Sequence, residues 1–132
     1  MQQPTVLPFM MFQGEGSAAL DFYRSLFPDL QIEQIERYRK GEAGPEGSIK
    51  LARFSIGRQS ILCSDSYVKH GFSFTPSFSL FVECGSEQQI RSLTEALTHG
   101  GAALMPLGAY GFGTLFAWVT DRFGVSWQLR YA

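Results

Sequence analysis

The chain has 132 residues and a mass of 14.7 kDa, and its formal net charge of −1 excludes a basic surface for nucleic acid. No apolar run approaches the roughly 20 residues of a membrane span, and the first residues lack the basic and apolar regions of a signal peptide. We therefore expect one domain over 1–132, located in the cytoplasm, with no nucleic acid and no membrane as a partner. Cys63 and Cys84 have no His-rich neighbourhood and are expected to be buried free thiols.

The first half of the chain predicts the element order β-α-β-β-β. Residues 8–12 form an apolar run typical of a strand, and Gly14 and Gly16 turn the chain into a helix that ends before Pro28. Further strands are expected at 30–38, 48–56 and 60–64, with a tight hairpin at Gly57-Arg58.

The second half predicts the same order again. A strand over 77–83 leads to a capping box formed by Ser86 and Gln89, and then to a helix that ends at Gly100-Gly101. Strands are expected at 103–107, 115–120 and 125–131. The sequence therefore predicts an α+β fold of two tandem βαβββ modules, 1–65 and 66–132, with curved mixed sheets.

The glycines near the N-terminus allow a second interpretation. The spacing Gly14-x-Gly16-x-x-Ala19 could cradle the phosphate of a dinucleotide. A dinucleotide fold, however, alternates strands and helices throughout, whereas each helix here is followed by three strands. We therefore interpret these glycines as turn formers.

Strand alternation predicts a ligand cup, because successive side chains of a strand point to opposite faces. One face of each strand suits a helix, and the other mixes polar and apolar groups, as Leu51, Arg53 and Ser55 do. Such a half-polar sheet face is typical of a binding site, although an antiparallel sheet can also leave one face open to solvent. The candidate ligand-binding residues are Arg53, Ser77, Ser79, Gln128, Met10, Phe12, Phe81, Tyr110 and Phe112.

Other candidate residues allow a structural role as well as a functional one. His70 lies in a loop with Lys69 and could be an acid/base group or a solvated side chain, and His99 ends a helix. Tyr110 and Phe112 lie between glycines, where they could fold over a ligand or anchor the loop. No catalytic residue is assigned.

Two segments carry a resemblance to a known family. Phe12 to Tyr23 and Trp118 to Trp127 resemble the opening and the ending of PhnB-like proteins, a group often labelled 3-demethylubiquinone-9 3-methyltransferase-like. These proteins belong to the vicinal oxygen chelate, or glyoxalase/bleomycin resistance/dioxygenase, superfamily. The resemblance implies the paired βαβββ fold and a homodimer. We expect no methyl transfer, because the sequence shows no methyl-donor-binding fold.

The resemblance also implies where metal-using members would place their ligands. Those four positions fall on Pro8, Leu51, Ser77 and Gln128. Divalent metals prefer imidazole, carboxylate or thiolate ligands, and none of these residues supplies one. We therefore expect no metal site and no cofactor.

Two functions follow as alternatives. The first is a metal-free protein that binds a small organic molecule with an anionic or carbonyl group and an apolar part. The second is an enzyme of the lyase, isomerase or dioxygenase type, which uses a divalent metal or acid/base groups at positions not located in the sequence.

Overall fold

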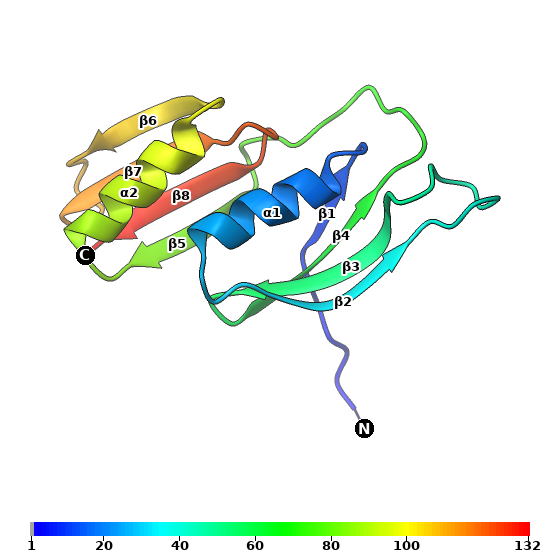
Figure 1. Cartoon of the computed structure of the whole chain (residues 1–132). Helices are drawn as coiled ribbons and strands as arrows, with labels where there is room; N and C mark the ends of the chain where they lie inside the picture. The colour runs from blue at the N-terminus through cyan, green and yellow to red at the C-terminus, as the bar shows by residue number, and fades with distance from the viewer. Residues whose placement is uncertain (1) are drawn as a thin grey trace. The chain divides into compact units, whose positions relative to one another are not determined.

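The structure is a computed structural model that describes residues 2–132 of the chain. The chain divides after His70 into two compact units, and each unit is a four-stranded mixed sheet with one helix (Figure 1). The predicted α+β fold of two βαβββ modules is confirmed. The expectation that 1–132 forms a single domain stays a prediction.

The first unit has the strand order β1-β4-β3-β2, in which β1 runs parallel to β4 and the other neighbours are antiparallel. Its elements are β1 (Phe9–Phe12), α1 (Gly16–Leu26), β2 (Gln31–Arg37), β3 (Ile49–Ile56) and β4 (Gln59–Asp65). The hairpin between β3 and β4 turns on Gly57 and Arg58, whose φ angles of 54° and 72° are those of a two-residue primed turn.

The second unit repeats this arrangement with the order β5-β8-β7-β6, in which β5 runs parallel to β8. Its elements are β5 (Ser79–Cys84), α2 (Glu87–Thr98), β6 (Ala102–Gly108), β7 (Leu115–Thr120) and β8 (Ser126–Tyr131). Strand β5 begins two residues later than expected, because Ser77 lies in a turn where its hydroxyl contacts that of Thr75 at 2.8 Å.

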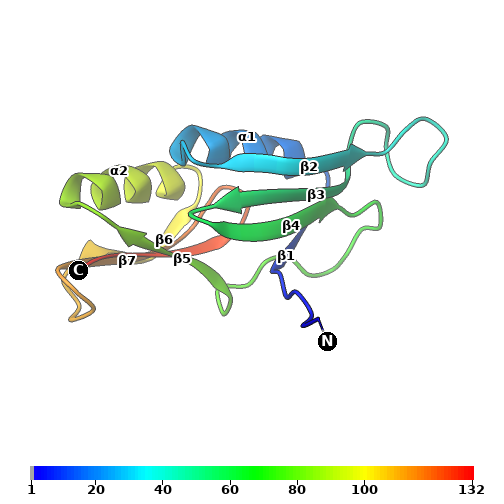
Figure 2. The same ribbon diagram turned by 90° about the horizontal axis from the view of Figure 1, so that it is seen from below.

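Each helix covers one face of its own sheet (Figure 2). In the first unit Leu20 and Tyr23 of α1 are buried, as are Phe54 of β3 and Ile61 of β4. In the second unit, Ser86 caps α2 by accepting a hydrogen bond from the amide of Gln89 at 3.1 Å, as the capping box predicted. The opposite face of each sheet is left uncovered by its own helix, and we call it the open face.

Candidate functional site

The open face of the second sheet carries three of the predicted ligand-binding residues. Phe81 lies opposite Gln128 in the register of β5 and β8, and Ser79 lies opposite Ser126. The neighbouring Trp127 and Leu129 are at most 1% exposed on the helix side. The side chains of β8 therefore alternate between the helix side and the open face.

The polar groups of this face are linked by hydrogen bonds. The amide of Gln128 donates to the hydroxyl of Ser79 at 3.4 Å, and Ser79 contacts the hydroxyl of Ser126 at 2.6 Å. The indole N–H of Trp118 on β7 donates to Ser126 at 2.9 Å. The long Gln128 contact is weak, so this amide can turn to another acceptor at little cost.

Four aromatic rings gather beside these polar groups, and we call them the aromatic cluster. Phe116 of β7 is at its centre, with ring centroids 6.5 Å from Phe81, 6.2 Å from Tyr110 and 5.0 Å from Phe112. Phe116 is only 6% exposed although it lies on the open face, whereas Phe81 and Phe112 are each 52% exposed. The cluster thus presents exposed aromatic surface next to neutral hydrogen-bonding groups.

The charged groups of this face neutralise each other. A guanidinium nitrogen of Arg130 lies 2.6 Å from a carboxylate oxygen of Glu83, and the same guanidinium lies 5.9 Å from the ring centre of Phe81. Both residues belong to strands that flank the cluster, β8 and β5. Within the second unit the open face is therefore aromatic and neutral overall.

The open face of the first sheet carries Arg53. Its Nε lies 3.4 Å from a carboxylate oxygen of Glu33, but it is buried and makes no hydrogen bond to any described residue. The carboxylate partner of Arg53 is therefore Glu33. The contact is about 40% exposed on both sides, so it contributes little to stability.

The assignment of Met10 and Phe12 to the cup face is wrong. They lie opposite Cys63 and Asp65 in the register, and they are 5% and 4% exposed on the helix side of the sheet. Strand β1 reads Phe-Met-Met-Phe, so its four apolar side chains give no alternation from which a face could be chosen. The open-face residues of this strand are Phe9 and Met11, opposite Leu62 and Ser64.

The positions expected to ligate a metal in metal-using relatives are spread over both units. Pro8 precedes β1, Leu51 lies on β3, Ser77 precedes β5 and Gln128 lies on β8. Among residues 2–132, no group of three or more His, Cys, Asp or Glu side chains could hold a metal ion. The residues present therefore do not form a recognisable ligand set within either unit.

A buried carboxylate at the end of β4 organises the glycine turn before α1. Asp65 is 3% exposed and accepts hydrogen bonds from the amides of Gly14 at 3.1 Å, Gly16 at 2.8 Å and Ile49 at 2.9 Å. A Cβ atom on Gly16 would lie 2.9 Å from the carboxylate, so the glycine is needed for this approach. The amides that could hold a phosphate are therefore occupied by the chain's own carboxylate.

A second buried carboxylate, Asp121, organises the turn between β7 and β8. It is 3% exposed and accepts hydrogen bonds from the amides of Phe123 at 2.8 Å and Val125 at 3.0 Å, and from the indole of Trp127 at 2.9 Å. The only local signal of Asp65 and Asp121 in the sequence is an acidic residue at the end of an apolar strand.

His70 is engaged in loop structure. The hydroxyl of Ser66 donates to the carbonyl of Val68 at 2.9 Å, and it contacts Nε2 of His70 at 3.0 Å. The Ser66 hydroxyl therefore bridges His70 and the backbone of the loop, and the donor and acceptor roles of Nε2 depend on the tautomer of the ring.

The two cysteines are buried free thiols, as expected. Burial raises the pKa of Cys63 to about 12, with a smaller contribution from the nearby Asp65 carboxylate. Burial likewise raises the pKa of Cys84 to about 11, with Glu83 adding to the effect. Both thiols therefore stay protonated at neutral pH and are poor nucleophiles.

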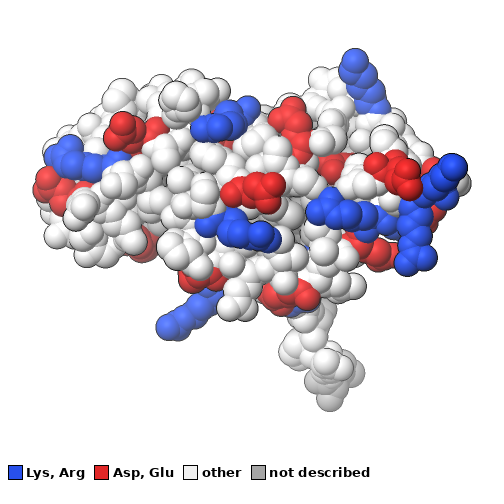
Figure 3. All heavy atoms as spheres, in the orientation of Figure 1, with Lys and Arg blue, Asp and Glu red and all other residues white. Residues whose placement is uncertain are grey.

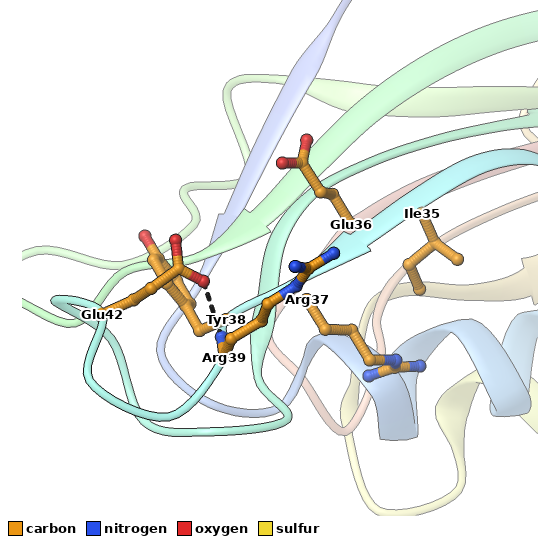
Figure 4. Close-up of a pocket in the computed structure, with 6 residues that line it drawn as sticks. All are labelled: Ile35, Glu36, Arg37, Tyr38, Arg39 and Glu42. Carbon is orange, nitrogen blue, oxygen red and sulfur yellow. Dashed lines mark hydrogen bonds between the residues drawn. The ribbon is translucent and has the colours of Figure 1, made fainter.

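A shallow depression of about 610 Å³ lies in the first unit, where β2 ends and the loop to β3 begins (Figure 4). Its lining residues are Ile35, Glu36, Arg37, Tyr38, Arg39 and Glu42. Acidic and basic groups lie side by side at this end of the first unit, as Figure 3 shows at the right of the view. A carboxylate oxygen of Glu42 lies 2.9 Å from the Nζ atom of Lys50. The guanidinium of Arg37 donates hydrogen bonds to the hydroxyl of Ser17 and to the carbonyl of Gly47. None of the predicted ligand-binding residues lines this depression.

The helices of residues 2–132 are too short and too polar to cross a membrane.

Solved structures resemble the chain over nearly its whole length. The PhnB protein of Bacillus cereus is 43% identical with a TM-score of 0.93, and the match covers 98% of this chain and 100% of that one. A protein from Pseudomonas aeruginosa is 25% identical with a TM-score of 0.80, covering 98% of each chain. The genomically encoded fosfomycin resistance protein of Listeria monocytogenes is 9% identical with a TM-score of 0.66, covering 98% of this chain and 94% of that one, and shows likeness of fold alone.

No curated protein matches the chain. The family described as 3-demethylubiquinone-9 3-methyltransferase, however, matches residues 4–130. Together with the similarity to the Bacillus cereus protein, this match confirms the resemblance seen in the sequence. The chain therefore belongs to the 3-demethylubiquinone-9 3-methyltransferase family of PhnB-like proteins, which has the glyoxalase/bleomycin resistance/dioxygenase fold.

Proposed function

We propose that the chain is a metal-free binding protein for a small organic molecule, which is held on the open face of the second sheet. The observation that supports this most is the aromatic cluster beside Ser79 and Gln128. Exposed rings next to neutral hydrogen-bonding groups, of which the Gln128 amide is only weakly held, favour a ligand with an apolar part and a carbonyl group. The fold and family are consistent with this proposal and leave the ligand open.

The proposal does not include methyl transfer, although the family's description names it. Each unit is a mixed sheet with a single helix, which differs from a doubly wound nucleotide-type fold. The alternative of a lyase, isomerase or dioxygenase needs a metal or an acid/base group. His70 is committed to Ser66, and the described residues offer no metal-ligand cluster.

The first prediction concerns ligand binding. In a thermal-shift screen of small carbonyl compounds, a ligand that binds only the folded chain will raise its melting temperature. Phe81→Ala and Gln128→Ala are expected to weaken binding of that ligand by about tenfold each, because each removes one contact worth about 1 to 1.5 kcal/mol. Both side chains are partly exposed, so the melting temperature without ligand should change little.

Gln88→Ala, on the exposed face of α2, is the matched control and should bind like the parent. If Phe81→Ala and Gln128→Ala also bind like the parent, the proposed site is wrong. Near-stoichiometric zinc, iron, nickel or manganese in protein purified without chelator would instead favour the enzyme.

Arg53, on the open face of the first sheet, is proposed as a separate contact for a ligand with an anionic or carbonyl group. Its Nε is buried without a hydrogen bond, so an acceptor placed beside it would satisfy a donor that the unliganded protein leaves open. Arg53→Ala is therefore included in the same screen and should weaken binding of a carboxylate ligand. The exposed Arg91, which pairs with Glu87 along α2, supplies the control substitution Arg91→Ala.

We also propose that the chain forms a homodimer. Large apolar side chains that are more than half exposed occur in both units, among them Phe9, Phe72 and Phe78, and association would remove this surface from water. Light scattering at micromolar concentration should then give twice the chain mass of 14.7 kDa. A mass near that of one chain would contradict the proposal.

We also propose that the chain is located in the cytoplasm. Its support is the two buried free thiols, Cys63 and Cys84, which suit a reducing compartment. A fluorescent fusion of the chain found at the cell envelope would contradict it.

A further inference from the structure

We propose that the ring of Phe112 fills the ligand's place in the unliganded protein, so that the site takes an uncharged aromatic ring that displaces Phe112. This inference rests on the proposed function, which it deepens by naming the ligand's class and the residue that gates the site. Phe112 is then a gate in the chain itself. It leaves the cluster when the ligand enters.

The ring contacts support this exchange. Phe112 lies nearest to Phe116, with centroids 5.0 Å apart and planes inclined at 60°, a geometry that aromatic pairs favour. Phe116 is only 6% exposed on the open face, while Phe112 is 52% exposed. The centre of the cluster is thus covered by a side chain that is itself half in water, and a six-membered ring fits there because one already occupies the place.

The backbone of the loop 109–113 confines the movement to Phe112. On one side, the hydroxyl of Tyr110 donates to the carbonyl of Pro106 at 2.6 Å, and on the other the amide of Thr114 donates to the carbonyl of Tyr131 at 2.8 Å. Between these anchors, Gly111 and Gly113 have φ angles of 91° and 107°. A Cβ on Gly113 would lie 2.8 Å from the carbonyl of Tyr131, whereas Gly111 has open space around it. Gly113 is therefore packed against the end of β8, whereas no neighbouring atom crowds Gly111.

The charges around the cluster favour a neutral ligand. Arg130 and Glu83 lie 2.6 Å apart and form an ion pair that has no net charge as a whole. The polar groups beside the cluster are all neutral, namely Ser79, Ser126, Gln128 and the indole N–H of Trp118. An aromatic amide therefore matches the site better than an aromatic carboxylate, whose desolvation would not be compensated.

The experiment titrates benzamide, benzoate and cyclohexanecarboxamide into ¹⁵N-labelled protein and follows the indole N–H signal of Trp118. Trp118 lies opposite Gln128 in the register and donates to Ser126, so its signal reports the open face of the second sheet. The chain has two tryptophans, and Trp118→Phe identifies which signal belongs to Trp118. The variants are Phe112→Ala and, as the matched control, Phe78→Ala, which is 66% exposed in the same unit.

Benzamide is expected to bind more tightly than either other probe, and Phe112→Ala should tighten its binding by about two- to tenfold, because the ligand no longer has to break one ring–ring contact. Phe78→Ala should leave binding unchanged. If Phe112→Ala binds benzamide no more tightly than the parent does, the gate is wrong. If the parent binds benzoate or cyclohexanecarboxamide more tightly than benzamide, the ligand class is wrong.

A further substitution separates this inference from the proposed function. If benzamide binds and Phe81→Ala weakens it, but Phe112→Ala does not tighten it, only the gate fails. If none of the three probes shifts the Trp118 signal in the parent or in Phe112→Ala, the named ligand class is wrong. The proposed function itself fails only when ligands found by thermal shift bind Phe81→Ala and Gln128→Ala as tightly as they bind the parent.

Discussion

Asp65→Ala is expected to lower the free energy of unfolding by about 4 kcal/mol, because each buried amide left without an acceptor costs roughly 1 to 3 kcal/mol. Asp65 accepts from three backbone amides, one in the turn before α1, one at the first residue of α1 and one at the start of β3. Its removal leaves the first turn of α1 uncapped, since Glu15 at the N-cap position makes no side-chain hydrogen bond of its own. Urea unfolding followed by far-UV circular dichroism measures the loss.

Asp65→Asn gives a graded test of the same geometry. One carboxylate oxygen serves Gly14 and Gly16, and the other serves Ile49. An asparagine can keep the first oxygen, but its amide nitrogen then faces the N–H of Ile49, so its stability should fall between the parent and Asp65→Ala. Asp21→Ala, at an exposed position of α1, is the control and should stay within about 0.5 kcal/mol of the parent. A similarly small loss for Asp65→Ala would show that these hydrogen bonds do not hold the turn.

Asp65 also explains why the glycine spacing was ambiguous in the sequence. Gly14 and Gly16 have the local features of a phosphate loop, because both arrangements need backbone amides that an anion can approach closely. The anion comes from the same chain, from a strand 49 residues further on. No local pattern encodes that partner, so the sequence could exclude the dinucleotide fold only through the order of its elements.

The element order and the faces of the inner strands could be predicted because hydrophobic periodicity determines both. Strands β3 and β8 alternate clearly, and Ala52 and Phe54 of β3 are buried as their spacing predicted. This reasoning failed for strand β1 because all four of its side chains are apolar. Which of them face the helix depends on the register of β1 with β4. Alternation identifies a face only where polar side chains mark the other one.

Only part of the aromatic cluster could be predicted from the sequence, for a related reason. The exposed position of Phe81 follows from alternation along β5, and a role for Tyr110 and Phe112 was suggested by the surrounding glycines. The sequence did not show that both loop rings fold back onto Phe116, because that contact depends on how a glycine-rich loop leaves its sheet. The binding role of these residues, and of Arg53, stays a prediction.

Asp121→Ala is expected to cost about 4 kcal/mol of unfolding free energy in the second unit, for the same physical reason. Asp121 accepts from the amides of Phe123 and Val125 and from the indole of Trp127. Trp127 is 1% exposed, so its N–H cannot turn to water when the carboxylate is removed. Far-UV circular dichroism in urea is the suitable measurement, because tryptophan fluorescence would itself respond to the substitution.

A double-mutant cycle isolates the indole contact from the turn. Asp121→Asn can keep the oxygen that serves Phe123 and Val125, but it sets its amide nitrogen against the N–H of Trp127. Trp127→Phe removes that N–H, so it should cost roughly 1 to 2 kcal/mol less in the Asp121→Asn background than in the parent. Additive costs, within about 0.5 kcal/mol, would mean that the indole does not depend on this carboxylate. The packing loss of Trp127→Phe enters both arms of the cycle and cancels, so the cycle measures the hydrogen bond together with the donor–donor contact that Asp121→Asn introduces.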